Sequence, residues 1–254
     1  MRRTYYYSDP VHDDFSPAKP EQKQLKPGYR YFPRNPIFRI AAFLLYRVVA
    51  IPVVYILNKI VYAETYVGLT KLRKSWLKGA FLYGNHTRTM GDAYTPQIIS
   101  CPVRNFTLVN SASVTDPCLA FFVKQLGGIP VPDSRESYRG FMKALDEIHR
   151  RRQNVFIYPE AHIWPTYTGI RDFPAGSFDY PVKYHAPAYA VTTTFHKRLI
   201  GPWVRTRVYI DGPFWPDETL PKAEARKKLR DEVYAAMVAR SKLSTYQYHT
   251  FTEK

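Results

Sequence analysis

Short apolar runs alternate with helix-like stretches along most of the chain from residue 77 onward. Five of these runs predict strands, at 80–83, 106–109, 154–158, 188–195 and 204–210, and the last two have the β-branched and aromatic residues that suit a sheet. Between them, a helix is predicted over 116–126, capped by Ser113 or Thr115, and apolar residues at helical spacing predict another over 138–148. A last helix with a buried stripe starts near Pro221. This alternation predicts an α/β fold, with helices against one sheet.

The first 67 residues break this pattern. Residues 1–36 hold six prolines among Tyr, Lys and Asp, so we expect an extended, basic and Pro-rich tail. Residues 37–67 are more apolar, but their longest uncharged run, 48–58, is much shorter than the ~20 residues of a spanning helix. We therefore expect a membrane-associating segment of one or two helices, broken near Pro52, that lies among lipid headgroups. Ordinary core helices are the alternative.

Length and the absence of an internal linker set the remaining boundaries. A chain of 254 residues accommodates one sizeable domain, and we assign it to residues 68–241, followed by a C-terminal tail over 242–254. The two cysteines, Cys101 and Cys118, show no CxxC spacing, so we expect reduced packing residues of a protein that faces the cytosol. A disulfide between them is the less favoured alternative.

Charge narrows the choice of partners. Lys and Arg outnumber Asp and Glu by 37 to 21, and the formal net charge of +16 favours an anionic partner such as lipid headgroups, nucleic acid or an acidic carrier. The cations are spread over the tail, the apolar segment and residues 150–152, and no RNP, helix-turn-helix or zinc-finger signature accompanies them. We therefore expect an anionic membrane surface and no nucleic acid.

His86 and Asp92 are the candidate chemical groups. A carboxylate that accepts one ring N–H fixes the tautomer of an imidazole and stabilises the imidazolium, which makes the histidine a general base. Six positions along one helix would place the two side chains on different faces. They can meet if His86 lies in the turn after strand 80–83 and a helix begins near Gly91 or Asp92. The alternative is a surface histidine beside a helix-capping aspartate.

Four blocks of sequence occur in a characteristic order. They are Asn85-His86 with Asp92, Gly-Gly-Ile-Pro-Val-Pro-Asp-Ser-Arg at 127–135, Tyr-Pro-Glu-Ala-His-Ile-Trp at 158–164, and Pro-Ala-Gly-Ser at 174–177 leading into 186–191. In this order, from about residue 76 to 214, they resemble the lysophospholipid acyltransferase family, which includes the 1-acylglycerol-3-phosphate acyltransferases. Five residues separate His86 from Asp92, where the family has four. The resemblance implies a single mixed sheet flanked by helices, the glycerolipid acyltransferase fold.

The resemblance also implies an activity. The protein would be an O-acyltransferase that moves a fatty acyl chain from acyl-CoA or acyl carrier protein to a hydroxyl of a lysolipid acceptor, on the cytoplasmic face of a membrane. His86 would be the base and Asp92 its partner, with no cofactor and no metal. The substrate-binding residues implied by the blocks are Asn85, Arg135, Glu160, His162 and Arg171.

Some of these assignments have alternatives. Ile163 stands where the family has a phosphate-binding arginine, and Arg171 or Arg135 is the candidate replacement. Arg171 could instead pair with Asp172 on the surface, and His162 could pack against its own loop and not against substrate. For the whole chain, the competing hypothesis is a membrane-bound lipid-binding protein of the same fold that has lost or changed its activity.

The predicted partner class can be tested directly. We expect the purified protein to co-sediment with anionic liposomes and to show no retention on oligonucleotides at physiological salt, because binding to nucleic-acid phosphates weakens steeply with salt. Neutral liposomes are the control. Retention on oligonucleotides alone would contradict the assignment of a membrane surface.

Overall fold

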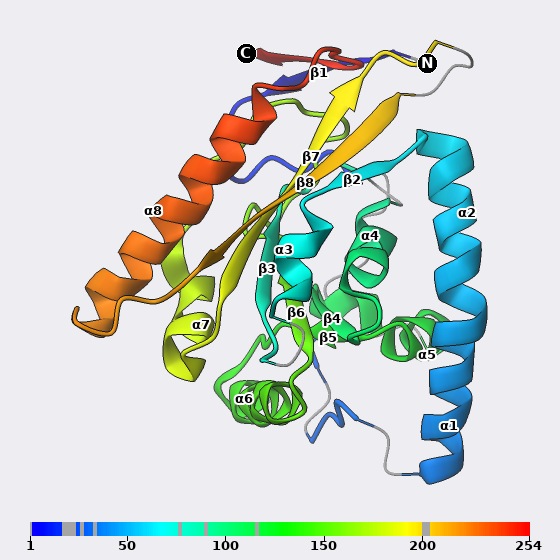
Figure 1. Cartoon of the computed structure of the whole chain (residues 1–254), viewed down its shortest axis with the longest axis vertical. Helices are drawn as coiled ribbons and strands as arrows, with labels where there is room; N and C mark the ends of the chain where they lie inside the picture. Colours follow the sequence, from blue (N-terminus) through cyan, green and yellow to red (C-terminus); the bar gives the residue numbers. More distant parts are fainter. Residues whose placement is uncertain are drawn as a thin grey trace.

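A central sheet organises the computed structural model, which describes residues 2–16, 24–25, 28–32, 35–75, 78–88, 91–114, 117–199 and 204–254. Within these residues its strands are β2 (Thr65–Val67), β3 (Phe81–Gly84), β4 (Asn105–Val109), β5 (Gly128–Pro130), β6 (Asn154–Ile157), β7 (Ala188–His196) and β8 (Arg205–Phe214). They are paired in the order β2-β8-β7-β3-β6-β4-β5 (Figure 1). Only β7 and β8 pair antiparallel, so the predicted mixed sheet is confirmed.

Helices cover both faces of this sheet. They are α3 (Leu69–Arg73), α4 (Gly91–Ser100), α5 (Pro117–Gln125), α6 (Arg135–Arg150), α7 (Asp179–Tyr184) and α8 (Lys222–Ser241). Side chains alternate between the faces along each strand. In β3, Phe81 and Tyr83 pack with α6, α7 and α8 in one core cluster, whereas Leu82 packs with Leu72 of α3 and Ile99 of α4 in the other. A strand buried on both faces reads as a continuous apolar run, which is why its position was predictable.

The predicted elements of this domain are confirmed with small shifts of their ends. Each of the five predicted strands is present, and α5, α6 and α8 occupy the three predicted helical regions. The strands without a clear signal were β2 and β5, which have three residues each. The proposed cap Thr115 lies outside the described residues, as does the side chain of Cys118. Cys101 is exposed, so the prediction of a packing residue is wrong for it.

The apolar N-terminal segment forms one long helix. It consists of α1 (Pro36–Leu44), a π-helical stretch over Leu45–Ala50, and α2 (Ile51–Tyr62). The predicted break at Pro52 is wrong. The N–H of Ile51 bonds to the carbonyl of Tyr46, five residues back, and this wider turn makes room for the proline ring, which has no N–H to donate.

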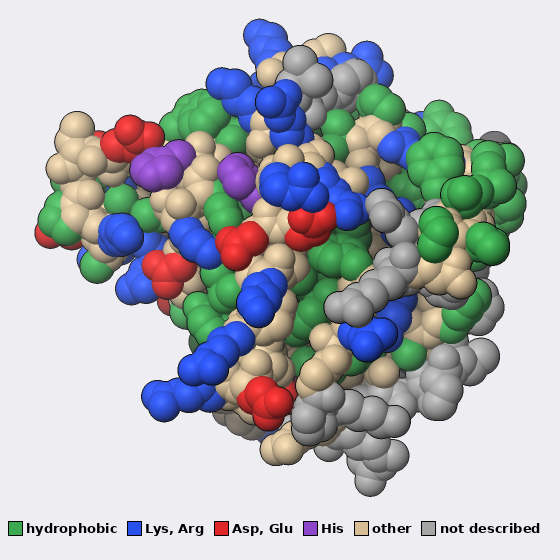
Figure 2. All heavy atoms as spheres, turned by 90° about the horizontal axis from the view of Figure 1, so that it is seen from below, with side chains coloured by type: hydrophobic (Ala, Val, Ile, Leu, Met, Phe, Trp, Pro, Cys, Tyr) green, Lys and Arg blue, Asp and Glu red, His purple; other side chains and the backbone are tan. Residues whose placement is uncertain are grey.

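This helix lies along one side of the domain (Figure 1). Tyr46 and Asn58 are buried against the domain, and the hydroxyl of Tyr46 bonds to Gln97 of α4. Many other apolar side chains are exposed, among them Ile40, Val48, Val53, Ile56 and Ile60. Figure 2 shows apolar side chains gathered on this side, with Lys and Arg scattered elsewhere on that face. By length and composition, the helical residues Leu45–Tyr62 could cross a membrane. The uncharged run 48–58 therefore underestimated the length of the apolar helix.

The two ends of the chain meet. Strand β1 (Thr4–Tyr7) pairs in parallel with β9 (Thr250–Glu253), at the top of Figure 1. Trp164 is buried beneath them, stacked on Phe251 at 5.0 Å between ring centroids, and its Nε1 donates to the carbonyl of Asp13 at 2.8 Å. Residues 2–16 and 250–254 therefore belong to the folded domain, which differs from the division predicted at residues 36 and 242. Their aromatic side chains pack against one another and against Trp164, a contribution that the count of prolines did not predict.

The core makes a stability prediction. Phe178 is fully buried and stacks on Tyr83 of β3, with 4.0 Å between ring centroids. We expect Phe178→Ala to lower the free energy of unfolding by about 3–5 kcal/mol, since it leaves a cavity under the sheet. Urea unfolding followed by circular dichroism measures this. Leu199→Ala is the control, because Leu199 is 100% exposed and its replacement should change the value by less than about 0.5 kcal/mol.

Candidate active site

The candidate site lies where two neighbouring strands end. Strands β3 and β6 pair in parallel, so their carboxyl ends share one edge of the sheet. His86 follows β3, and Tyr158 and Glu160 follow β6. Gly84 allows this close approach, since a Cβ at that position would come within 2.6 Å of the Phe156 ring. Parallel pairing and one missing side chain therefore bring the two loops together.

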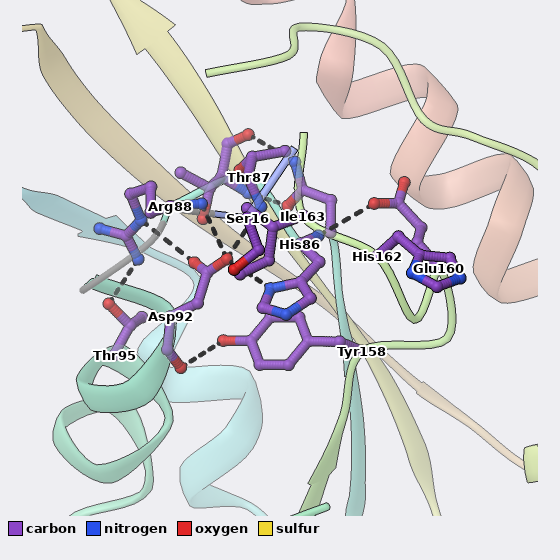
Figure 3. Close-up of polar contacts among 12 residues, drawn as sticks. Ser16, His86, Thr87, Arg88, Asp92, Thr95, Tyr158, Glu160, His162 and Ile163 are labelled. Atoms are coloured by element: carbon purple, nitrogen blue, oxygen red, sulfur yellow. Dashed lines mark hydrogen bonds and ion pairs between the residues drawn. The ribbon is translucent and has the colours of Figure 1, made fainter. Parts of the chain in front are cut away.

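His86 and Asp92 form a hydrogen-bonded pair. The Nδ1 of His86 lies 2.9 Å from Oδ2 of Asp92, which is in the first turn of α4 (Figure 3). The same oxygen accepts the backbone N–H groups of Thr87 at 2.8 Å and of Arg88 at 2.9 Å. The predicted arrangement is confirmed: a non-helical turn carries His86, the helix begins at Gly91, and the turn folds back onto the carboxylate.

Tyr158 completes the surroundings of the imidazole. Its ring stacks on that of His86, with 4.4 Å between centroids and 20° between planes, and its hydroxyl donates to the carbonyl of Asp92 at 2.6 Å. Burial raises the pKa of Tyr158 well above its ordinary value, so the hydroxyl stays protonated and remains a donor. The His86 side chain keeps 19% of its exposure. Figure 3 also shows Ser16, from the N-terminal segment, among the residues around the pair.

Glu160 holds the backbone of the site. Its Oε2 accepts the N–H of His86 at 3.0 Å, and its Oε1 accepts the N–H of Arg171 at 3.0 Å. Burial raises the pKa of Glu160, and the nearby Arg171 opposes that shift. Glu160 is only 4% exposed and both of its oxygens already have partners, so in this structure it contacts the backbone of His86 and Arg171 from inside the fold.

Arg171 is also an internal residue. Its Nη2 lies 3.5 Å from Oε2 of Glu160 and bonds to the carbonyl of His162, while the guanidinium lies 5.1 Å from the centroid of Trp164. The alternative pairing with Asp172 is wrong, because Asp172 pairs with Arg230. Arg171 is buried, so it too would need a movement of the loop to reach a phosphate.

The other predicted substrate residues take separate places. The side chain of Asn85 is buried and bonds to both backbone groups of Thr193 in β7, at 2.8 and 3.0 Å, so it joins the turn to the sheet. Arg135 is the exposed first residue of α6, after β5, which is three strands from β3. His162 is partly exposed, and its Nδ1 lies 3.9 Å from Asp14. The structure thus does not bring Arg135 to the His86–Asp92 pair.

The sequence prediction missed several residues at this site. Tyr158 could have been found from its place at the end of a predicted strand, immediately before Pro159-Glu160. Arg88 and Glu64 had no such signal, because a buried ion pair over 24 positions leaves no periodic pattern. In the described part of the chain, no group of three or more His, Cys, Asp or Glu side chains is placed to hold a metal ion.

Comparison with known proteins supports the fold. No protein-family model and no curated protein sequence matches this chain. Among solved structures, it is similar to the 1-acyl-sn-glycerophosphate (LPA) acyltransferase PlsC from Thermotoga maritima, with a TM-score of 0.57. The match covers 85% of this chain and 86% of that chain at 15% sequence identity. This chain therefore has the fold of that acyltransferase, as the four sequence blocks predicted.

The position of Asn85 leads to a prediction. Asn85→Ala leaves a buried N–H and a buried C=O of Thr193 without partners, so we expect the free energy of unfolding to fall by roughly 2–5 kcal/mol. Chemical denaturation measures the loss. Asn110→Ala is the control, because Asn110 is exposed and its side chain accepts one backbone N–H, from Ala112, so its cost should stay below about 1 kcal/mol. Equal costs would contradict a special role for Asn85.

Proposed function

We propose that this protein is an O-acyltransferase that moves a fatty acyl chain from an acyl thioester to a hydroxyl of a lysophospholipid or related lipid. The observation that carries the proposal is the pairing of His86 with Asp92 at 2.9 Å, after the strand that leads into the site, in a chain with the fold of a lysophosphatidic acid acyltransferase. The fold by itself does not define a reaction. The pair supplies the base that the reaction needs.

The chemistry follows from the geometry. With Nδ1–H donating to Asp92, the other ring nitrogen of His86 carries a lone pair and accepts the proton of the acceptor hydroxyl. The oxygen attacks the thioester carbonyl, the carbon–sulfur bond breaks, and the imidazolium returns its proton to the leaving thiolate. The charge of Asp92 stabilises the imidazolium while it exists. The Tyr158 ring and the Glu160 bond to the His86 N–H hold the imidazole in place.

The N-terminal helix supports a membrane location for this reaction. Its exposed apolar face and the net charge of +16 both favour a lipid surface with anionic headgroups. We place the protein on the cytoplasmic face, where acyl-CoA or acyl carrier protein would be the donor. His162 and Arg135 remain the candidates for acceptor contacts, since their side chains are not buried. Asn85, Glu160 and Arg171 would act by positioning the loops.

One observation favours a second function. Ile163 stands in place of a phosphate-binding arginine, and Arg171 is engaged inside the fold by Glu160 and Trp164. A lysolipid phosphate thus lacks an evident cation at this loop. A lipid-binding protein of the same fold without transfer activity would have this feature.

Replacing the base separates the two functions. We expect His86→Ala to reduce acyl transfer by roughly 10²–10⁴-fold, the typical contribution of a general base. The assay measures free thiol released from acyl-CoA in the presence of a panel of lysolipids in vesicles. His185→Ala is the matched control, because His185 pairs on the surface with Glu218 and should keep full activity.

Two outcomes would contradict the proposal. Full activity of His86→Ala would mean that the base lies elsewhere. Folded wild-type protein that binds the vesicles but releases no thiol with any acceptor, from either acyl-CoA or acyl carrier protein, would favour the lipid-binding function.

A further inference from the structure

A second buried carboxylate lies behind the pair of His86 and Asp92. Arg88, only 3% exposed, stands between the two acids: its Nε lies 3.3 Å from Oδ1 of Asp92, and its Nη1 pairs with Glu64. Its Nη2 donates to the hydroxyl of Thr95 at 2.6 Å, a contact drawn in Figure 3. His86, Asp92, Arg88 and Glu64 therefore form one continuous chain of charged or chargeable groups.

Glu64 has no part in the proposed reaction, yet it is the most completely buried of these groups. It is 0% exposed, in the link between α2 and β2. Its oxygens accept from Thr95 at 3.0 Å, from Thr206 at 3.3 Å and from Asn58 at 3.4 Å, besides the pair with Arg88. A carboxylate is costly to bury unless it is paired and hydrogen-bonded. The four partners of Glu64 meet this cost, and the question is what a buried charge does at this position.

The two oxygens of Asp92 are used differently. Oδ1 faces Arg88 at the long distance of 3.3 Å, whereas Oδ2 accepts His86 and two backbone N–H groups at 2.8 to 2.9 Å. Glu64 and Thr95 hold the two Nη atoms of Arg88 and leave only Nε for Asp92. Without Glu64, the guanidinium would be free to pair with Asp92 alone, and its charge would weaken the attraction of Asp92 for an imidazolium.

The net charge of the group also indicates that Glu64 favours the imidazolium. Glu64, Arg88 and Asp92 together carry a formal charge of minus one, which the imidazolium of His86 neutralises when it forms. Burial opposes the charge on Arg88, but Glu64 and then Asp92 more than offset this and raise its pKa above the ordinary value, so the guanidinium stays charged. Removing Glu64 would bring the group to zero before the proton arrives and to plus one afterwards.

We propose that Glu64 and Arg88 are positioning residues for the general base: Glu64 limits Arg88 to one long contact with Asp92 and supplies the negative charge that the imidazolium of His86 requires. This inference rests on the proposed function, which gives His86 its task. It also explains why the end of the N-terminal helix is bonded to the site, through Asn58 and Glu64.

Other groups near the imidazole do not replace this charge. Tyr158 stacks on His86, Tyr62 lies 5.5 Å from the Arg88 guanidinium, and burial raises the pKa of both phenols, so they stay neutral. Glu160 bonds to the N–H of His86 but is paired with Arg171, so those two contribute no net charge. The net charge around the His86 imidazole is therefore set by Asp92, Arg88 and Glu64.

The test removes buried charges of opposite sign. Glu64→Gln removes a negative charge, Arg88→Gln removes a positive one, and the double variant restores the original sum. We expect the titration midpoint of the His86 imidazole, followed by NMR, to move down by roughly half a pH unit or more in Glu64→Gln and up by as much in Arg88→Gln. In the double variant it should return to within about 0.3 of the wild-type midpoint. The His86 signal is the one that His86→Ala removes.

Acyl transfer gives a second readout. The acid limb of the pH profile of kcat/KM should move in the same order as the NMR midpoints, because the unprotonated imidazole is the active form. Glu147→Gln is the matched control: it makes the same change in net charge on α6, where Glu147 pairs with Arg150 and Arg151, and should move neither readout. If Arg88→Gln fails to fold, the comparison of Glu64→Gln with the double variant still tests the inference.

The outcomes separate the two proposals. Midpoints that stay fixed, or that move in the same direction in Glu64→Gln and the double variant, would show that Glu64 and Arg88 only pack, and would overturn the inference. Midpoints in the expected order without any thiol release from wild-type protein would support the charge coupling and reject the acyltransferase function.

Discussion

The carboxylate of Asp92 is the interaction on which the rest of the site depends. It is buried at the first turn of α4, where a charge without partners would be strongly unfavourable. Its partners are the imidazole of His86, the backbone N–H groups of Thr87 and Arg88, and the Arg88 guanidinium. The same bonds that satisfy Asp92 shape the turn and aim His86. Structure and proposed chemistry therefore rest on one set of hydrogen bonds.

The sheet brings the remaining parts of the site into range. Parallel pairing aligns the ends of β3 and β6, and β7 continues past the end of β3 beside them. Glu160 holds the N–H of His86, and Asn85 holds the backbone of Thr193. The chain termini add a further layer, since Trp164 of the loop after β6 packs against Phe251 and bonds to Asp13. These contacts join segments that are distant in the sequence around the imidazole.

The N-terminal helix links this support to the proposed membrane surface. Its outer face is apolar, its inner face is fixed to α4 by Tyr46 and Gln97, and its end leads to Glu64. If this helix binds a membrane, as proposed, it would bring the lipid surface to an element that is bonded to the charged groups behind His86. The proposed lipid contact and the proposed alignment of the base would then depend on the same helix.

The sequence by itself determined the α/β alternation, five of the strands and the candidate pair of His86 and Asp92, because buried strands and amphipathic helices leave periodic local patterns. It assigned Asn85, Glu160 and Arg171 to substrate binding without showing their contacts, and it missed Tyr158, Arg88 and Glu64. Only the tertiary structure showed the contacts of these six residues, since their partners lie up to 142 positions away and such bonds have no period along the chain. It also decided that Pro52 lies within a continuous helix and that the two termini pair, because a π-helical turn and a cluster of aromatic rings stabilise conformations that local propensity disfavours.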